Sequence, residues 1–246
     1  MSVFTVPANT PGYSVSLAQD GADVWDALRL RHLVFTGELG ARLDSPIPGI
    51  DIDEHDPRCE HLIVRENATG LAVGTYRLLP PDGGERLHSD SLFDLSRLAD
   101  LRGSMVEIGR LCVHPDHRDG TVVKLLWSGV TRYMRDSGHD WLAGGCSVPL
   151  DDGGRRAAAA WNRVRRDHLA PAEHRVVPIT AWDACPVPPS GPAPLPSLLR
   201  GYLRLGARVC GPPAYDAALR SADFFMLLSM DEMDSRHRHP LLGATA

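Results

Sequence analysis

The 246-residue chain has no apolar run close to the roughly 20 residues that a membrane-spanning helix needs. It also has no C-x-x-C pair, whereas a disulfide framework or structural zinc site requires closely paired cysteines. We therefore expect free thiols, no metal, and a reduced cytoplasmic protein whose surface can still contact a membrane. The five cysteines are odd in number and widely spaced: Cys59, Cys112, Cys146, Cys185 and Cys210.

Lysine is nearly absent, since Lys124 is the only one among 26 basic residues. The formal net charge is -5 and there is no block of like charges, which argues against nucleic acid as the main partner. Residues 1–13 lack the charged start and apolar core of a signal peptide, so we expect a loose N-terminal arm there.

The hydrophobic pattern predicts an α/β fold with no internal repeat and no clear linker, so residues 1–246 are expected to form a single domain. Six prolines within residues 186–196 predict a stiff surface excursion. The expected helices are residues 23–35, 92–98, 121–137, 155–168 and 198–205. The expected strands are residues 13–17, 61–65, 71–79, 105–113, 141–148 and 223–230.

Residues 105–138, MVEIGRLCVHPDHRDGTVVKLLWSGVTRYMRDSG, are the most informative stretch. They read as an apolar strand, a polar turn with Pro, Asp and Gly, and a helix that Gly138 ends. The turn leads into a helix N-terminus, where unpaired N–H groups and the helix dipole favour an anion.

This unit resembles the cofactor-binding core of the GNAT acyltransferases, in which a Val-His-Pro turn and an Arg/Gly loop cradle a pyrophosphate. The resemblance implies a GNAT fold, with a mixed, twisted central sheet flanked by helices, and no permanently bound cofactor. It also implies acyl-CoA, or a phosphopantetheine thioester on an acyl carrier protein, as co-substrate. Two usual family glycines are replaced by Thr121 and Val123, and Asp119 adds a negative charge to the loop. The implied donor-binding residues are Leu111, Cys112, Val113, Arg118, Asp119, Gly120, Thr121, Val122 and Val123.

Five blocks in order narrow the resemblance to one GNAT branch. They are similar to the ornithine-lipid acyltransferases and their relatives among acyl-homoserine-lactone synthases and N-acyl amino acid synthases. The resemblance implies transfer of a fatty acyl group from a thioester to the amine of an amino acid such as ornithine. The blocks are residues 30–40, residues 51–62 (D-x-D-x-x-D-x-x-C-x-H-L), residues 74–79 (GTYRLL), residues 107–115 (EIGRLCVHP) and residues 199–224.

Amide formation needs donors for a tetrahedral oxyanion and a base for the amine. A bulge in the strand 105–113, expected at Gly109, would free backbone N–H groups for the oxyanion. Glu107 is the expected base, with Arg110 beside it, although strict alternation would put these two on opposite faces of the strand. A bulge between them would bring both into one cleft; alternatively, both are structural and pair with other groups. Ser147 could protonate the departing thiolate, or only cap a turn.

Arg31, Asp53 and Asp56 look like the family's acceptor-side residues, because Arg can bind the carboxylate of an amino acid and Asp its ammonium group. The alternative is a solvated acidic loop beside a surface arginine. The D-x-D-x-x-D spacing lacks the Gly and Glu of a calcium loop, so no metal is expected there.

Three other functions stay open at this stage. A homoserine lactone synthase would acylate S-adenosylmethionine. A non-catalytic acyl-thioester-binding module is suggested by the missing glycines and by Asp119. A protein acetyltransferase is a further alternative within the same superfamily.

Overall fold

The computed structural model describes residues 11–37, 45–81, 86–183 and 194–233. The chain divides into two compact units: residues 1–80, 108–138 and 235–246 form the first, and residues 81–107 and 139–234 form the second. Most of the expected N-terminal arm and of the proline-rich excursion 186–196 lies outside the described residues. The single-domain organisation stays a prediction.

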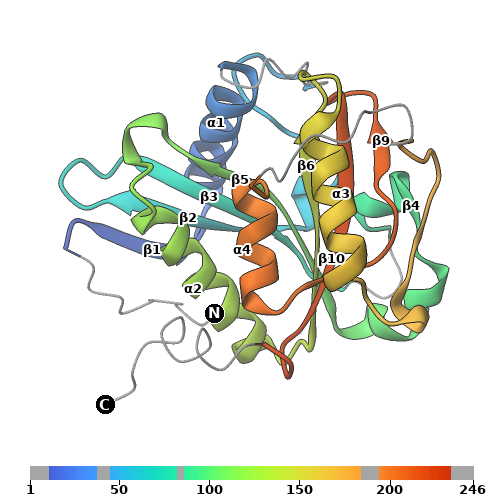
Figure 1. The fold of residues 1–246 in the computed structure, drawn as a ribbon. Helices are drawn as coiled ribbons and strands as arrows, with labels where there is room; N and C mark the ends of the chain where they lie inside the picture. The colour runs from blue at the N-terminus through green and yellow to red at the C-terminus, as the bar shows by residue number, and fades with distance from the viewer. Residues whose placement is uncertain (1–10, 38–44, 82–85, 184–193, 234–246) are drawn as a thin grey trace. The chain divides into compact units, whose positions relative to one another are not determined.

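The first unit is built on antiparallel strands β1 (Tyr13–Leu17), β2 (Glu60–Glu66) and β3 (Ala72–Leu79), followed in the sheet by β5 (Met105–Val113) from residue 108 onward. Helices α1 (Gly21–Gly37) and α2 (Thr121–Ser137) cover opposite faces of this sheet (Figure 1). Ala27 of α1 packs on Ile63, whereas Gly129 of α2 lies against the neighbouring Leu62. Successive strand residues point to opposite faces, so the two contacts define the two layers.

Close packing of α2 depends on a glycine in β3. A Cβ atom added at Gly74 would lie only 2.3 Å from Cγ1 of Val122, at the start of α2. This approach fixes the N-terminal turn of α2, and with it the loop that was expected to bind the donor.

The second unit contains β6 (Trp141–Pro149) and β10 (Ser221–Ser229), which pair antiparallel along their full length. The short strands β8 (Arg208–Val209) and β9 (Ala214–Asp216) also pair with β10. Helix α3 (Arg155–Asp167) buries its alanine side against β6, and α4 (Ser197–Leu205) precedes β8. A separate two-stranded sheet joins β4 (Phe93–Asp94) to β7 (Val177–Pro178).

The expected helix at residues 92–98 is wrong. Phe93 pairs with Pro178 in the small sheet, and the Leu92 carbonyl accepts a hydrogen bond from the Ile179 N–H group. Only from Ser96 does the chain turn into the 3-10 helix η3 (Ser96–Ser104). Pairing with a strand far along the chain overrides the local preference. The remaining 3-10 helices are η1 (Asp56–Arg58), η2 (His88–Ser91), η4 (Pro115–His117) and η5 (Ala172–His174).

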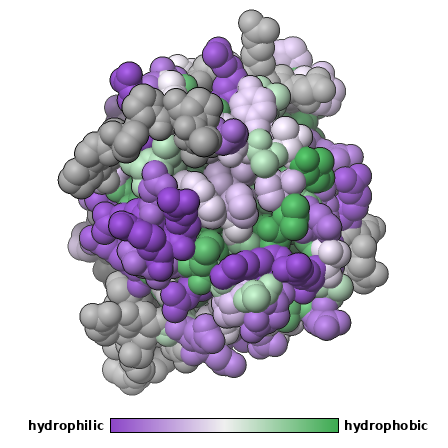
Figure 2. Space-filling view, turned by 45° about the vertical axis from the view of Figure 1, so that its right-hand side comes forward, coloured by the Kyte–Doolittle hydropathy of each residue, from purple (hydrophilic) through white to green (hydrophobic). Residues whose placement is uncertain are grey.

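The other expected helices and strands are confirmed within a few residues at their ends. Gly138 ends α2 in the left-handed conformation, with φ of +70°. In the described parts of the chain, no helix has both the length and the apolar character to cross a membrane. The face drawn in Figure 2 is mostly hydrophilic, and its hydrophobic residues occur in small groups.

Candidate active site

A network of arginines and aspartates lies between α1 and the sheet of the first unit. Because it contains three residues of each kind, their formal charges balance. The three aspartates come from one short segment, residues 51–56, whereas the three arginines come from segments far apart in the sequence, so the fold assembles the network. Its members are Arg31, Arg77, Arg110, Asp51, Asp53 and Asp56.

One end of the network is closed. Arg31 has no solvent exposure, and its guanidinium donates to both Asp56 oxygens, at 2.6 and 3.2 Å, and to Asp51 at 2.8 Å. Burial alone would raise the pKa of the Asp56 carboxyl, but the hydrogen bonds and positive charge of Arg31 and Arg77 lower it. The predicted acceptor residues Arg31 and Asp56 are therefore buried and already hydrogen-bonded to each other.

The other end is partly open to solvent. Nη1 of Arg77 donates to both Asp53 oxygens, at 2.6 and 2.7 Å, and Nη2 of Arg110 donates to Asp53 at 3.1 Å. The side chains of Asp53 and Arg110 keep 22% and 18% of their exposure. Burial opposes ionisation of Asp53, but the charges of Arg77 and Arg110 hold its pKa well below the usual range. This end can present both an anion and a cation to a small molecule.

Strand β5 is irregular at Arg110, one residue after the expected position at Gly109. Arg110 has φ of +57°, a left-handed conformation that few non-glycine residues adopt. Its guanidinium lies 5.5 Å from the centre of the Phe35 ring, and its buried Nε atom has no hydrogen-bond partner. The contacts with Asp53 and Phe35 offset the backbone strain, so the side chain rather than a glycine fixes the irregularity.

Glu107, at the other side of this irregularity, has its own partners in the second unit. Its carboxylate accepts hydrogen bonds from the backbone N–H groups of His88, at 2.6 Å, and Ser89, at 3.0 Å, and from the Ser89 hydroxyl. Glu107 is also buried. The side chain thus holds the start of η2.

The loop that was expected to bind the donor forms hydrogen bonds with its own ends. The Asp119 carboxylate accepts a hydrogen bond from the Thr121 N–H group at the start of α2, at 2.8 Å, which lowers the pKa of Asp119. The Arg118 guanidinium donates to the Val113 carbonyl, at 2.9 Å from Nη2. Gly120, between Asp119 and Thr121, has φ of +93° and allows the chain to turn there. Asp119 therefore occupies the helix N-terminus where a phosphate would otherwise accept the hydrogen bond.

Cys112, in the expected donor strand, is a packing residue. Its side chain lies with Leu30 and Val34 in one apolar cluster. Burial raises the pKa of its thiol to about 12, so a thiolate nucleophile is not available at neutral pH.

Ser147 lies on β6 of the second unit, directly opposite Asp223 of β10, and is exposed. Asp223 is buried, and burial raises its pKa to about 6. Sequence reasoning selected Ser147 and missed Asp223. The only signal for Asp223 is a charged residue inside the otherwise apolar run of residues 222–228.

Arg77, Asp51 and His61 were also not predicted as site residues, although all three lie in the sequence blocks 51–62 and 74–79. His61 is buried without a hydrogen bond to either ring nitrogen, and burial lowers its pKa to about 4. It is therefore a neutral imidazole beside the network, 3.8 Å from Asp56.

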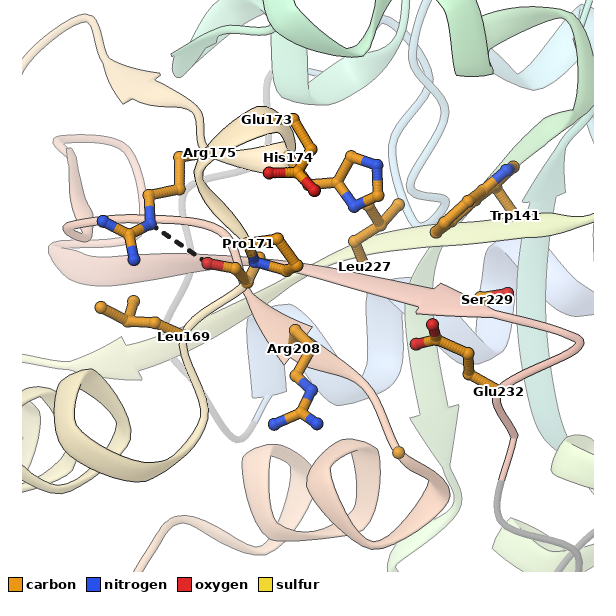
Figure 3. A pocket seen from close by; sticks show the side chains of 12 residues that line it. Trp141, Leu169, Pro171, Glu173, His174, Arg175, Arg208, Leu227, Ser229 and Glu232 are labelled. Carbon is orange, nitrogen blue, oxygen red and sulfur yellow. Dashed lines mark hydrogen bonds between the residues drawn. The ribbon is translucent and has the colours of Figure 1, made fainter.

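The second unit also contains a pocket of about 550 Å³. Figure 3 shows Trp141, Ser229 and Glu232 on one side and Arg175 on the other, with Arg208 between them. The rings of Trp141 and His174 meet edge to face at 5.1 Å. None of the predicted site residues lines this pocket.

Comparison with known proteins places the fold. The Acetyltransferase (GNAT) domain family matches residues 30–128. FeeM, an N-acyl amino acid synthase from uncultured soil microbes, superposes with a TM-score of 0.55 at 14% identity, covering 94% of this chain and 98% of that chain. The acyl-homoserine lactone synthase BjaI superposes with a TM-score of 0.54 at 17% identity, covering 89% and 79%. The chain has the GNAT fold, which confirms the predicted fold class.

Two curated relatives are more specific. The L-ornithine N(alpha)-acyltransferase of Rhodobacter capsulatus is 30% identical over 92% of this chain and 93% of its own length. That of Rhizobium meliloti is 32% identical over 90% of this chain and 81% of its own length. The chain belongs to the L-ornithine N(alpha)-acyltransferase family, and the predicted branch, enzyme class and N-acyltransferase activity are confirmed.

Proposed function

We propose that this enzyme transfers a fatty acyl group from a thioester to the α-amino group of ornithine or a related amino acid. The observation that carries the proposal is the open end of the network, where Asp53 and Arg110 remain partly exposed while their neighbours are buried. The carboxylate of an amino acid would bind Arg110, and its ammonium group would bind Asp53.

In this proposal the closed end of the network supports the open end. Arg31, Asp51 and Asp56 fix one another, and Arg77 bridges Asp56 to Asp53. Side chains that are locked in this way hold a binding group in position at little entropic cost. Arg31 and Asp56 would therefore act on the acceptor through Asp53.

The α-amino group has a pKa of about 8, so a weak base suffices to deliver the neutral amine. Glu107 remains the proposed base, acting through a water molecule because three donors already hold its oxygens. Irregular backbone next to Arg110 supports a site for the oxyanion in β5.

An acyl carrier protein is the donor that the loop favours. Asp119 and Arg118, which would meet the pyrophosphate of coenzyme A, are both bonded within the loop. Helix α3 adds an argument from charge: within the described residues, four of its exposed arginines form no hydrogen bond or ion pair, and such a surface suits an acidic protein. These arginines are Arg155, Arg163, Arg165 and Arg166.

The test is a reaction of the purified protein with ornithine and one fatty acyl chain, presented either on carrier protein or on coenzyme A. Mass spectrometry should find the amide of ornithine, and free thiol should appear at the same rate, with kcat/KM higher for the carrier-bound donor. Arg110→Gln should reduce the rate, whereas the matched variant of the exposed Arg135 on α2, Arg135→Gln, should not. No amide from either donor, or a lactone from S-adenosylmethionine, would overturn the proposal.

A further inference from the structure

The floor of the pocket in the second unit is one face of the sheet that β6, β10 and β8 form. Trp141 pairs with Ser229, and Leu227 pairs with Arg208. Directly opposite residues of antiparallel strands share a face of the sheet, and so do residues two apart in one strand. The strand register therefore brings these four side chains to the same face, and all four line the pocket.

The segment that follows α3 forms a second wall. It is fixed to β8, because the Ala170 N–H group donates to the Val209 carbonyl and the Val209 N–H group donates to the His168 carbonyl, both at 2.9 Å. At the end of η5, the His174 ring meets the Trp141 ring edge to face. The walls are thus held by backbone pairing and ring packing, and the volume of about 550 Å³ is typical of a small-molecule site.

Four charged side chains of both signs line this pocket without pairing with one another. All four are exposed, and within the described parts of the chain none of them forms an ion pair. An unpaired cation and an unpaired anion that share one cavity can be bridged by a molecule that carries both charges. The four residues are Glu173, Arg175, Arg208 and Glu232.

The two ends of such a molecule can be assigned. Nε of Arg175 already donates to the Ala170 carbonyl at 3.1 Å, whereas the Arg208 guanidinium donates no hydrogen bond to the described residues. Arg208 is therefore the group for an anion. Glu232 and Trp141 lie on the same side of the pocket (Figure 3). A carboxylate and an aromatic ring both attract an ammonium group.

We propose that this pocket binds a free amino acid as its zwitterion, with the carboxylate on Arg208 and an ammonium group between Glu232 and Trp141. The side chains of Leu169 and Leu227 would contact its aliphatic part. The site lies within the second unit and shares no residue with the arginine–aspartate network, so amino acid binding there does not require the proposed function. L-Ornithine, the acceptor in that proposal, is a zwitterion of this class and serves as the probe.

The number of sites provides the first test, measured by equilibrium dialysis with radiolabelled L-ornithine. The wild type should bind two molecules per chain, and Arg110→Gln should keep only the one in the pocket. In that background, Arg208→Gln or Glu232→Gln should weaken binding at least roughly 10-fold, because each removes a charged partner. The matched controls Arg204→Gln and Asp167→Asn, at exposed positions outside the pocket, should change nothing. Unchanged binding in the Arg208 and Glu232 variants would overturn the proposal.

The chemistry of the probe provides the second test, in the Arg110→Gln protein. Ornithine should change the tryptophan fluorescence, and Trp141→Phe should remove that change. Both 1,4-diaminobutane, which lacks the carboxylate, and pentanoate, which lacks the amines, should bind at least roughly 10-fold more weakly than ornithine. Equal binding of pentanoate would show a site for anions only, and equal binding of the diamine a site for cations only. Either result would contradict a zwitterion site.

This proposal and the proposed function can fail separately. A single site that Arg208→Gln removes and Arg110→Gln keeps would contradict the acceptor site and leave the pocket standing. A single site that Arg110→Gln removes and Arg208→Gln keeps would overturn only the pocket proposal. Amide formation from ornithine decides the proposed function in either case.

Discussion

A buried aspartate of the first unit and one of the second have pKa values shifted in opposite directions. In the first unit, Arg31 and Arg77 lower the pKa of Asp56 in spite of its burial, and Arg77 and Arg110 lower that of the partly exposed Asp53. In the second unit, the side chain of Asp223 has the hydroxyls of Ser221 and Ser147 as its hydrogen-bond partners among the described residues, and burial raises its pKa to about 6. The comparison teaches that the neighbouring charge, rather than depth alone, decides whether a buried aspartate binds charge or carries a proton.

The largest change in stability is expected when the arginine–aspartate network of the first unit is broken. Arg31→Met leaves Asp51 and Asp56 buried without their main partner, and should cost about 4 kcal/mol of unfolding free energy. Denaturant unfolding at pH 7 measures this loss. Arg65→Met, which removes a partly exposed bridge to Asp23, should cost less than about 1 kcal/mol. Equal losses in the two variants would contradict the view that Arg31 holds the network.

The next largest effect is the pH dependence of stability that Asp223 causes in the second unit. The pKa of Asp223 is about 6 in the folded protein and about 3.9 unfolded, so its contribution is fully present below pH 4 and is lost as pH rises to 6. Asp223→Asn never ionises, so the variant should gain about 3 kcal/mol over the wild type at pH 8 and little at pH 4. Unfolding curves at both pH values measure the difference, and a difference independent of pH would refute the raised pKa.

Glu107 should show a smaller effect on stability. In Glu107→Gln an amide NH₂ group replaces one oxygen that accepts from a backbone N–H group, which should cost about 2 kcal/mol. The exposed control Glu60→Gln should change stability by less than about 0.5 kcal/mol. Turnover measured on the same samples separates the roles: a strong loss of rate at temperatures where the variant is fully folded supports the base, and an unchanged rate leaves Glu107 only structural.

The smallest effect is expected at Cys112. Burial raises the pKa of its thiol to about 12, so iodoacetamide at pH 8 should label it slowly in the folded protein. Cys112→Ala should keep kcat within a few-fold, because the acyl group passes directly to the amine. Peptide mass spectrometry and turnover measure the two results, and a complete loss of activity in a folded variant would point to an acyl-enzyme instead.

The regular elements could be predicted because their signals are local. The apolar spacing of residues 121–137 and the closing Gly138 gave α2, and the apolar run at residues 141–148 gave β6. The prediction of a helix at residues 92–98 failed because this segment contains strand β4, which forms through its pairing with β7, more than 80 residues away.

The site was predicted less completely because it depends on side chains that meet only in the fold. The D-x-D-x-x-D block indicated acidic residues, but not that Arg31 would be buried against Asp56. The strand irregularity was expected at a glycine, whereas contacts with Asp53 and Phe35 place it at Arg110. Asp223 acquires its relation to Ser147 only through the register of β6 and β10, which no short motif encodes.

The most direct test of the account compares ornithine with 1,4-diaminobutane, which lacks only the carboxylate, as acceptors for the wild type and Arg110→Gln. If Arg110 binds the carboxylate, the wild type should prefer ornithine by about 100-fold in kcat/KM, in line with about 3 kcal/mol for a charged hydrogen bond. The variant should lose most of that preference, through a slower reaction with ornithine and an unchanged one with the diamine. A variant that keeps the full preference would contradict the assignment of the open end of the network to the acceptor.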